Sequence, residues 1–220
     1  MINRLLIPIV ALLTLSLGCQ ATRTAYYNTW EKFGYAKRER LVDNVKKARD
    51  EQTEAKKQFV TALEEFKSIT KFSGGELETV YNKLKAQYDA CESQAGEVRS
   101  KIQAVKNVAT SLFVEWQGEV GQIKDDDALQ RQSQQLLDRT KSNYEQLVVR
   151  MDAAAGTMDP VLQKFKNRVL FLKGNLNAQA LASLEGTNAE LGVGIDKLIA
   201  EMEKSIAEAD TFIGKMNTGN

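Results

Sequence analysis

Residues 77–116 read LETVYNKLKAQYDACESQAGEVRSKIQAVKNVATSLFVEW. Within this stretch an apolar or small residue recurs at alternating intervals of four and three positions without a break. The residues at these positions are Leu77, Tyr81, Leu84, Tyr88, Cys91, Ala95, Val98, Ile102, Val105, Ala109, Leu112 and Trp116. This spacing places them along one face of a helix, which we call its seam. The pattern predicts a long helix, from about residue 76 to residue 122, whose seam packs against other helices.

The same spacing continues on both sides of this stretch. One seam runs from Leu41 to Ile69, and two more run from Leu129 to Leu176 and from Leu181 to Phe212. We therefore expect four helices, at about 28–70, 76–122, 127–174 and 178–215. At about 1.5 Å per residue, such helices would be roughly 60–75 Å long.

Short polar or glycine-containing segments separate the expected helices, at 73–76, 124–127 and 174–177. Turns this short place successive helices antiparallel to one another. Pro160 lies inside the third seam, where it removes a backbone hydrogen bond, so we expect a kink or short break there. The sequence thus predicts an all-α protein, an elongated antiparallel coiled-coil-like bundle of about four long helices in one domain at 28–216.

Composition argues against several classes of function. The chain has 30 basic and 29 acidic residues, and removing the N-terminal segment 1–18, with its single Arg4, leaves 29 of each. A neutral protein lacks the basic excess that binds nucleic acid. Histidine is absent from the sequence, which removes the commonest general base and most zinc sites. We expect no nucleic-acid partner, no enzymatic activity, no metal and no cofactor.

The N-terminus has the pattern of a lipoprotein signal. A basic residue precedes the apolar run 5–17, which is too short to span a bilayer as a helix. Residues 15–19, LSLGC, resemble a lipobox, although Ser16 stands where that pattern prefers leucine. The resemblance implies that residues 1–18 are removed and that Cys19 becomes a lipid-bearing N-terminus. The alternative is an ordinary secretory signal in which Cys19 is incidental.

A lipidated Cys19 would hold the protein on a membrane, because several acyl chains make its release negligible. Gln20 follows the cysteine where an aspartate would signal retention. In Gram-negative lipoproteins this resemblance implies export to the outer membrane. We therefore expect the protein to face the periplasm from the inner leaflet of that membrane, with residues 19–27 as the lipidated N-terminus and a short tether.

A cluster of aromatic residues follows this tether closely. Its members are Tyr26, Tyr27, Trp30, Phe33 and Tyr35. Aromatic side chains of this kind suit the interface between a membrane and water. They would also serve as a hydrophobic cap on the helical bundle, and the sequence leaves both interpretations open.

The string LFLKGNLNA at 170–178 is the most distinctive local feature of the chain. Packing and helix capping account for its composition. Alternatively, Lys173, Gly174, Asn175 and Asn177 form an exposed partner-binding turn at one end of the rod. The expected partner is an envelope protein or peptidoglycan, whereas the sequence gives no indication of an oligomeric state.

Two further features have structural interpretations. Cys91 lies on a seam and is expected to be buried as a small apolar group, although a free thiol in an oxidising compartment invites an intermolecular disulfide. Asp125, Asp126 and Asp127 lack the spaced ligands of an EF-hand, so we expect them to cap the next helix.

Several strings together resemble a known family. They are Tyr26-Tyr27, the region from Lys37-Arg38 to Ala48-Arg49-Asp50, Glu115-Trp116-Gln117, and Leu170 through Leu184. They are similar to an uncharacterised bacterial, Gram-negative lipoprotein-like family that is catalogued only as a domain of unknown function. The resemblance covers nearly all of the chain after Cys19 and implies a periplasmic helical lipoprotein, without a substrate or a catalytic residue.

The sequence favours a structural or adaptor function, in which a lipid-anchored rod presents a face or a tip to another envelope component. The alternative is a periplasmic carrier whose bundle holds a lipid or another apolar ligand. Tyr81, Tyr88, Met151, Met158 and Phe165, at predicted interior positions, motivate this alternative. Such residues also simply fill protein cores.

Overall fold

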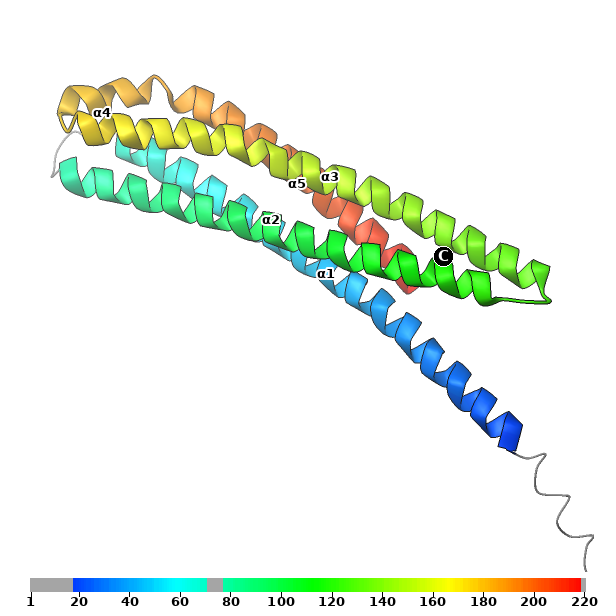
Figure 1. The fold of residues 1–220 in the computed structure, drawn as a ribbon. Coiled ribbons are helices and arrows are strands. Elements are labelled where there is room, and N and C mark those ends of the chain that lie inside the picture. The colour runs from blue at the N-terminus through cyan, green and yellow to red at the C-terminus, as the bar shows by residue number, and fades with distance from the viewer. Residues whose placement is uncertain (1–17, 71–76, 219–220) are drawn as a thin grey trace, which may run out of the picture.

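The computed structural model describes residues 18–70 and 77–218, with side chains described at 37–69 and 77–218. These residues form five helices and no strand (Figure 1). The helices are α1 (Gly18–Thr70), α2 (Leu77–Gln122), α3 (Asp127–Gly174), α4 (Ala178–Glu185) and α5 (Asn188–Asn217). The all-α prediction is therefore confirmed. The expected cap at 73–76 lies outside the described residues.

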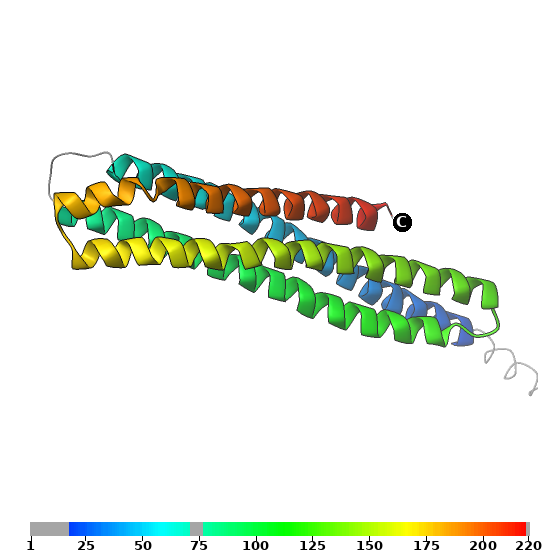
Figure 2. The same cartoon turned by 90° about the horizontal axis from the view of Figure 1, so that it is seen from above.

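Four long helices make up an elongated antiparallel bundle. In both views the chain runs up and down the long axis, and α1, α2, α3 and α5 lie side by side (Figures 1 and 2). The closely packed neighbours are α1 with α2, α2 with α3, α3 with α5, and α5 with α1. Short α4, of 8 residues, packs against α1 and α3.

The expected fourth helix is divided in two, which accounts for five helices in place of about four. The interruption falls at Gly186 and Thr187, between α4 and α5. The Thr187 hydroxyl donates to the Leu184 carbonyl (2.8 Å) and accepts from Arg168 Nε of α3 (3.0 Å). The three-four spacing passes unchanged through this turn, so the pattern alone could not reveal the interruption.

The predicted seams form the core. Along α1 the fully buried residues are Leu41, Val45, Ala48, Gln52, Ala55, Phe59, Ala62 and Phe66, all of them on the expected seam. In α2 the seam is buried from Leu84 to Trp116, with Leu77 and Tyr81 partly buried at its start. Two seam predictions in α3 are wrong, because Leu129 and Leu176 are 50% and 46% exposed at its two ends. Leu176 lies beyond the last helical residue, where the periodicity no longer sets its direction.

The predicted break at Pro160 is absent. Helix α3 is continuous from Asp127 to Gly174 and includes this proline. Pro160 and Gly156, whose carbonyl would receive the missing hydrogen bond, both lie on the exposed face. Water can therefore satisfy that carbonyl, while Met158 and Val161 pack into the core on either side. Packing of the buried face keeps the helix continuous at this point.

Aromatic side chains join three helices in the core. The rings of Phe66 and Phe165 meet edge to face with centroids 5.9 Å apart, and those of Tyr88 and Phe165 meet at 6.0 Å. Such pairs contribute about 0.5–1.5 kcal/mol beyond the burial of their area. The Tyr88 hydroxyl donates to Glu92 Oε1 (2.6 Å). The ring can therefore lie in the core while its hydroxyl group is hydrogen-bonded. The contacts fix α1, α2 and α3 at one level of the bundle.

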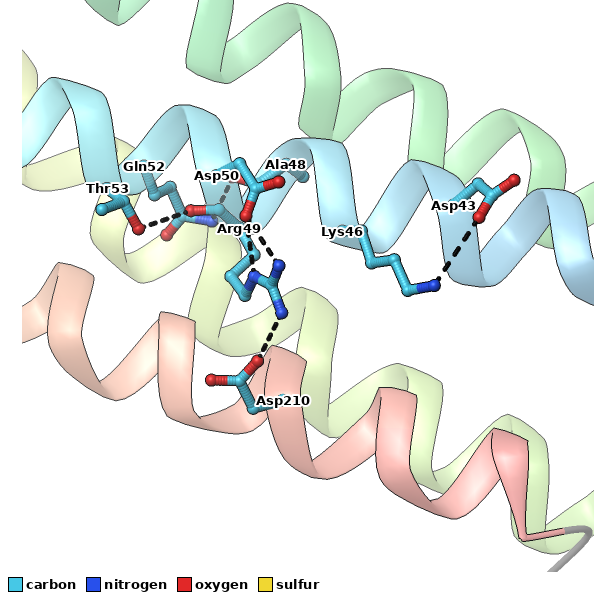
Figure 3. A network of polar contacts seen from close by, with 8 residues as sticks. All are labelled: Asp43, Lys46, Ala48, Arg49, Asp50, Gln52, Thr53 and Asp210. Carbon is cyan, nitrogen blue, oxygen red and sulfur yellow. Dashed lines mark hydrogen bonds and ion pairs between the residues drawn. The ribbon is translucent and has the colours of Figure 1, made fainter.

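Arg49 joins α5 to α1 on the outside of the bundle. Its guanidinium donates to Asp210 of α5 (2.7 Å) and to Asp50 of its own helix (2.7 and 2.9 Å) (Figure 3). Lys56 and Glu203 form a second ion pair between these helices, at 3.2 Å. Exposed pairs of this kind contribute roughly 0–1 kcal/mol each, so they align the helices more than they stabilise them.

Two polar side chains are buried in the core without complete hydrogen bonding. Gln52 and Ser205 are both fully buried. Gln52 Nε2 donates to the Ala48 carbonyl (3.2 Å), whereas Gln52 Oε1 and the Ser205 hydroxyl have no hydrogen-bond partner among the described residues. An unsatisfied buried acceptor costs about 1–3 kcal/mol. These positions therefore weaken a core that is otherwise apolar.

We predict that Gln52→Met stabilises the protein by about 1–2 kcal/mol, because it removes the unsatisfied acceptor and nearly conserves the volume. Urea unfolding followed by circular dichroism measures the change. The control is Gln132→Met, at an exposed position of α3, which should change stability by less than about 0.5 kcal/mol. A destabilising Gln52→Met would contradict the argument.

Candidate functional site

The start of α1 contains the cysteine that is predicted to bear lipid. Helix α1 begins at Gly18, so residues 19–27, which we expected to form a tether, are helical. Residues 19–33 contain no proline or glycine that would interrupt a helix. The aromatic cluster at 26–35 lies in the same helix, but its side chains, like that of Cys19, lie outside the described ones.

The junction where α1 joins the bundle is held by two adjacent contacts with α2. The Arg38 guanidinium lies over the Trp116 ring, 4.0 Å from its centroid, and Lys37 forms an ion pair with Glu115. Trp116 packs in turn in a small core cluster with Val120 of α2 and Leu137 of α3. From this level towards its N-terminus, α1 diverges from α2 and α3 (Figure 1).

Partial burial shapes the electrostatics of this junction. Burial lowers the pKa of Arg38, and the nearby charge of Glu119 opposes that shift. Burial also raises the pKa of Glu119, and the like charge of Glu115 adds to the increase. A cation stacked on an indole ring gains about 0.5–2 kcal/mol, which offsets the cost of desolvating Arg38. The junction is thus a structural clamp between α1 and α2.

The bundle is thinner at this end, because α5 stops early. Lys215, near the end of α5, donates to Asn143 of α3 (2.9 Å), and α3 begins 16 residues earlier, at Asp127. Beyond this level α1, α2 and α3 continue without α5. The small cluster of Trp116, Val120 and Leu137 is the core of this thinner part.

The opposite end of the bundle carries the predicted partner-binding turn, between α3 and α4. Asn177 caps α4, because its Oδ1 accepts from the Ala180 amide (2.8 Å). Asn175 ends α3, where its Nδ2 donates to the Phe171 carbonyl (3.0 Å). Lys173 and Gly174 are exposed beside them. The two asparagines therefore hold the backbone of the turn, and the side chains around them form its surface.

Sequence reasoning missed the exposed apolar residues at this end. Leu170, Phe171 and Leu176 are 53%, 42% and 46% exposed. Leu170 and Phe171 lie off the seam between Val169 and Leu172, which are buried. Their departure from the seam was visible in the sequence, and it could have marked them as a surface feature.

The Asp125–Asp127 segment caps α3, as expected. Asp126 Oδ1 accepts from the Leu129 amide (2.9 Å), and Asp127 lies in the first turn of the helix. Asp125 adopts a positive φ of 64°, which reverses the chain after α2. Among the described residues no group of three or more carboxylate or thiol side chains is arranged to hold a metal ion.

Cys91 is fully buried on the seam of α2, as predicted. Its thiol lies 3.9 Å from the Gln58 carbonyl of α1. Burial raises the pKa of this thiol to about 12, and the contact with Gln58 opposes the shift. The thiolate is therefore almost absent at neutral pH. The buried thiol also cannot reach a second chain to form an intermolecular disulfide.

We predict that Cys91 does not react with iodoacetamide at about pH 8 in the folded protein, where its raised pKa keeps it protonated, and that it reacts fully in urea. Mass spectrometry measures the labelling. Val114→Cys, at a position that is 72% exposed, provides the control thiol and should react in the folded state. Rapid labelling of native Cys91 would show that the bundle opens.

A family model matches most of the chain, including most of the described residues. The model of that family, described as Protein of unknown function (DUF2959), matches residues 26–216. The chain belongs to the DUF2959 family. The DUF2959 match runs from the aromatic segment of α1 to the end of α5, and so includes both ends of the bundle. Neither the curated proteins nor the solved structures contain a significant match to the chain. Among the described helices of this DUF2959 protein, none combines the length and the hydropathy needed to cross a membrane.

Proposed function

We propose that this DUF2959 protein is a lipid-anchored envelope protein with a structural or adaptor role. Lipid on Cys19 would hold one end at the periplasmic face of a membrane, and the far end would meet another component of the envelope. Gln20, directly after the cysteine, favours the inner leaflet of the outer membrane. The proposed partner is an envelope protein, peptidoglycan or another membrane surface.

The continuity of α1 carries this proposal. One helix of 53 residues, about 80 Å long, runs from Gly18 to Thr70. An anchor at Cys19 would therefore be joined to the bundle through a helix. The clamp of Arg38 on Trp116 fixes that helix to α2. A force or a displacement at the anchor would pass to the bundle more directly than through a flexible linker.

The arrangement of the two ends gives further support. The α3–α4 turn lies at the end of the bundle opposite to the start of α1 (Figure 1). Its backbone is held in a defined conformation by the hydrogen bonds of Asn175 and Asn177. A rod with an anchor at one end and a fixed surface at the other suits the presentation of a binding site at a distance from the membrane.

The alternative of a carrier requires the bundle to open around a ligand. Met151, Met158 and Phe165 are fully buried, and Phe165 is in contact with the rings of Phe66 and Tyr88. Their packing against other side chains fits a filled core. We therefore favour the structural role. Native mass spectrometry of the purified protein tests the alternative, and a lipid bound to the protein would support the carrier.

The anchor is tested by labelling cells with a palmitate analogue and separating their membranes. We expect label and membrane association for the wild type, and loss of both for Cys19→Ala, because the thiol is the attachment point. Cys91→Ala is the matched control, since Cys91 is the chain's other cysteine and is buried. It should retain both label and association. A Cys19→Ala protein that still carries the label would refute lipidation at this position.

The adaptor role is tested with a photo-crosslinking residue in place of Lys173, at the α3–α4 turn. We expect crosslinks from this position to one envelope component in intact cells. The same residue in place of Val149, which is 66% exposed on α3, should give none. Equal crosslinking from both positions would argue against a specific role for the turn.

A further inference from the structure

Exposed apolar residues gather at one end of the bundle. Seven large hydrophobic residues are exposed among those described, and three of them, Leu170, Phe171 and Leu176, fall within seven positions of the chain. The other four are scattered over α2, α3 and α5: Val114, Leu129, Val149 and Val193. We call the three clustered residues, with the exposed Lys164, Lys166 and Lys173 around them, the tip patch.

The apolar residues of the tip patch have no function in the core. The buried face of α3 at this end is formed by Phe165, Val169 and Leu172, while Leu170 and Phe171 point away from it. Leu176 follows on the turn between the asparagine caps. The protein thus exposes three large apolar side chains to water at one end of the bundle.

Within the chain segment that contains these residues, the charges are all of one sign. Between Pro160 and Leu184 the sequence contains four basic residues and no acidic one. Arg168 is used inside the structure, where it donates to Thr187 and pairs with Glu190 (3.4 Å). The three lysines of the tip patch are exposed, and none forms an ion pair with another described residue. The whole chain has a net charge of only +1, so this local excess is distinctive.

We propose that the tip patch binds the surface of an anionic lipid bilayer. Leucine and phenylalanine would enter the boundary between headgroups and acyl chains, and the lysines would lie at the level of the lipid phosphates. The inference rests on the proposed function for its context, because it names a bilayer as the component met by the end opposite to Cys19.

The composition of the patch favours a bilayer over a protein partner. Lysine is depleted in protein–protein interfaces, where arginine and large aromatic residues are enriched. The patch has three exposed lysines and no exposed arginine. A bilayer also accepts a projecting tip, since its headgroups rearrange around inserted side chains, whereas a protein partner would need a matching pocket.

The test measures sedimentation of a chain of residues 20–220 with lipid vesicles. Each described side-chain contact lies at residue 37 or beyond, so this unlipidated chain keeps the whole bundle. One set of vesicles contains equal parts of phosphatidylcholine and phosphatidylglycerol, and the other contains phosphatidylcholine alone. We expect binding to the anionic vesicles that weakens as salt is added, and much weaker binding to the neutral ones.

Replacing Lys164, Lys166 and Lys173 together by glutamine should weaken binding about a hundredfold, because each lysine at an anionic surface strengthens it roughly fivefold. The matched control replaces the exposed lysines Lys47, Lys124 and Lys197, on α1, the α2–α3 loop and α5, by glutamine. It makes the same change in net charge and should reduce binding far less.

Leu170→Ser combined with Phe171→Ser tests the apolar part of the patch and should strongly reduce sedimentation with anionic vesicles. Val114→Ser with Val149→Ser is the control, at exposed positions outside the patch. Circular dichroism should show unchanged thermal unfolding for all variants, because none of these side chains is in the core.

Tip-patch variants that bind as the wild type does would overturn the inference, as would equal binding to neutral vesicles. Crosslinks from position 173 to a protein instead of lipid would also overturn it, while leaving the adaptor role intact. Loss of palmitate labelling at Cys19 is measured separately, so a failure of the anchor is distinguishable from a failure of the tip patch.

Discussion

Burial of the apolar seams is the interaction on which the rest of this structure depends. Each long helix has one such line of side chains, and the line on α1 is fully buried from Leu41 to Phe66. A buried leucine or phenylalanine contributes about 1.5–3 kcal/mol, far more than an exposed ion pair. The strength of this packing explains why α3 continues through Pro160, and why the core accommodates Gln52 and Ser205 with unsatisfied polar atoms.

Polar residues beside the seams connect neighbouring helices and align them. Arg49 connects α1 with α5, Arg38 stacks on Trp116 of α2, and Arg168 holds the turn between α4 and α5. All three arginines have long side chains that can pack along a helix while their guanidinium groups reach the next one. Arg38, Arg49 and Trp116 belong to the strings that suggested a family resemblance, and in the structure they form contacts between helices.

The two ends of the bundle differ in chemistry. One end contains the start of α1 and a thinner part with a small core around Trp116, because α5 stops at Asn217. The other end has the α3–α4 turn, held by its asparagine caps, with apolar side chains and lysines on its surface. This difference between the two ends supports the proposed role of joining two components of the envelope, and it argues against a uniform rod that acts only as a spacer.

The sequence by itself determined the all-α class, most seam positions and most helix ends. A sustained three-four apolar periodicity suits only a helix, and glycine or polar segments mark the turns between helices. The sequence also indicated the burial of Cys91 and the capping by Asp126, since both depend on local spacing. The interruption at Thr187 was decided by tertiary structure, because Arg168 reaches it from another helix. The exposure of Leu176, which the seam predicted to be buried, was also decided by the structure, because α3 ends before this residue.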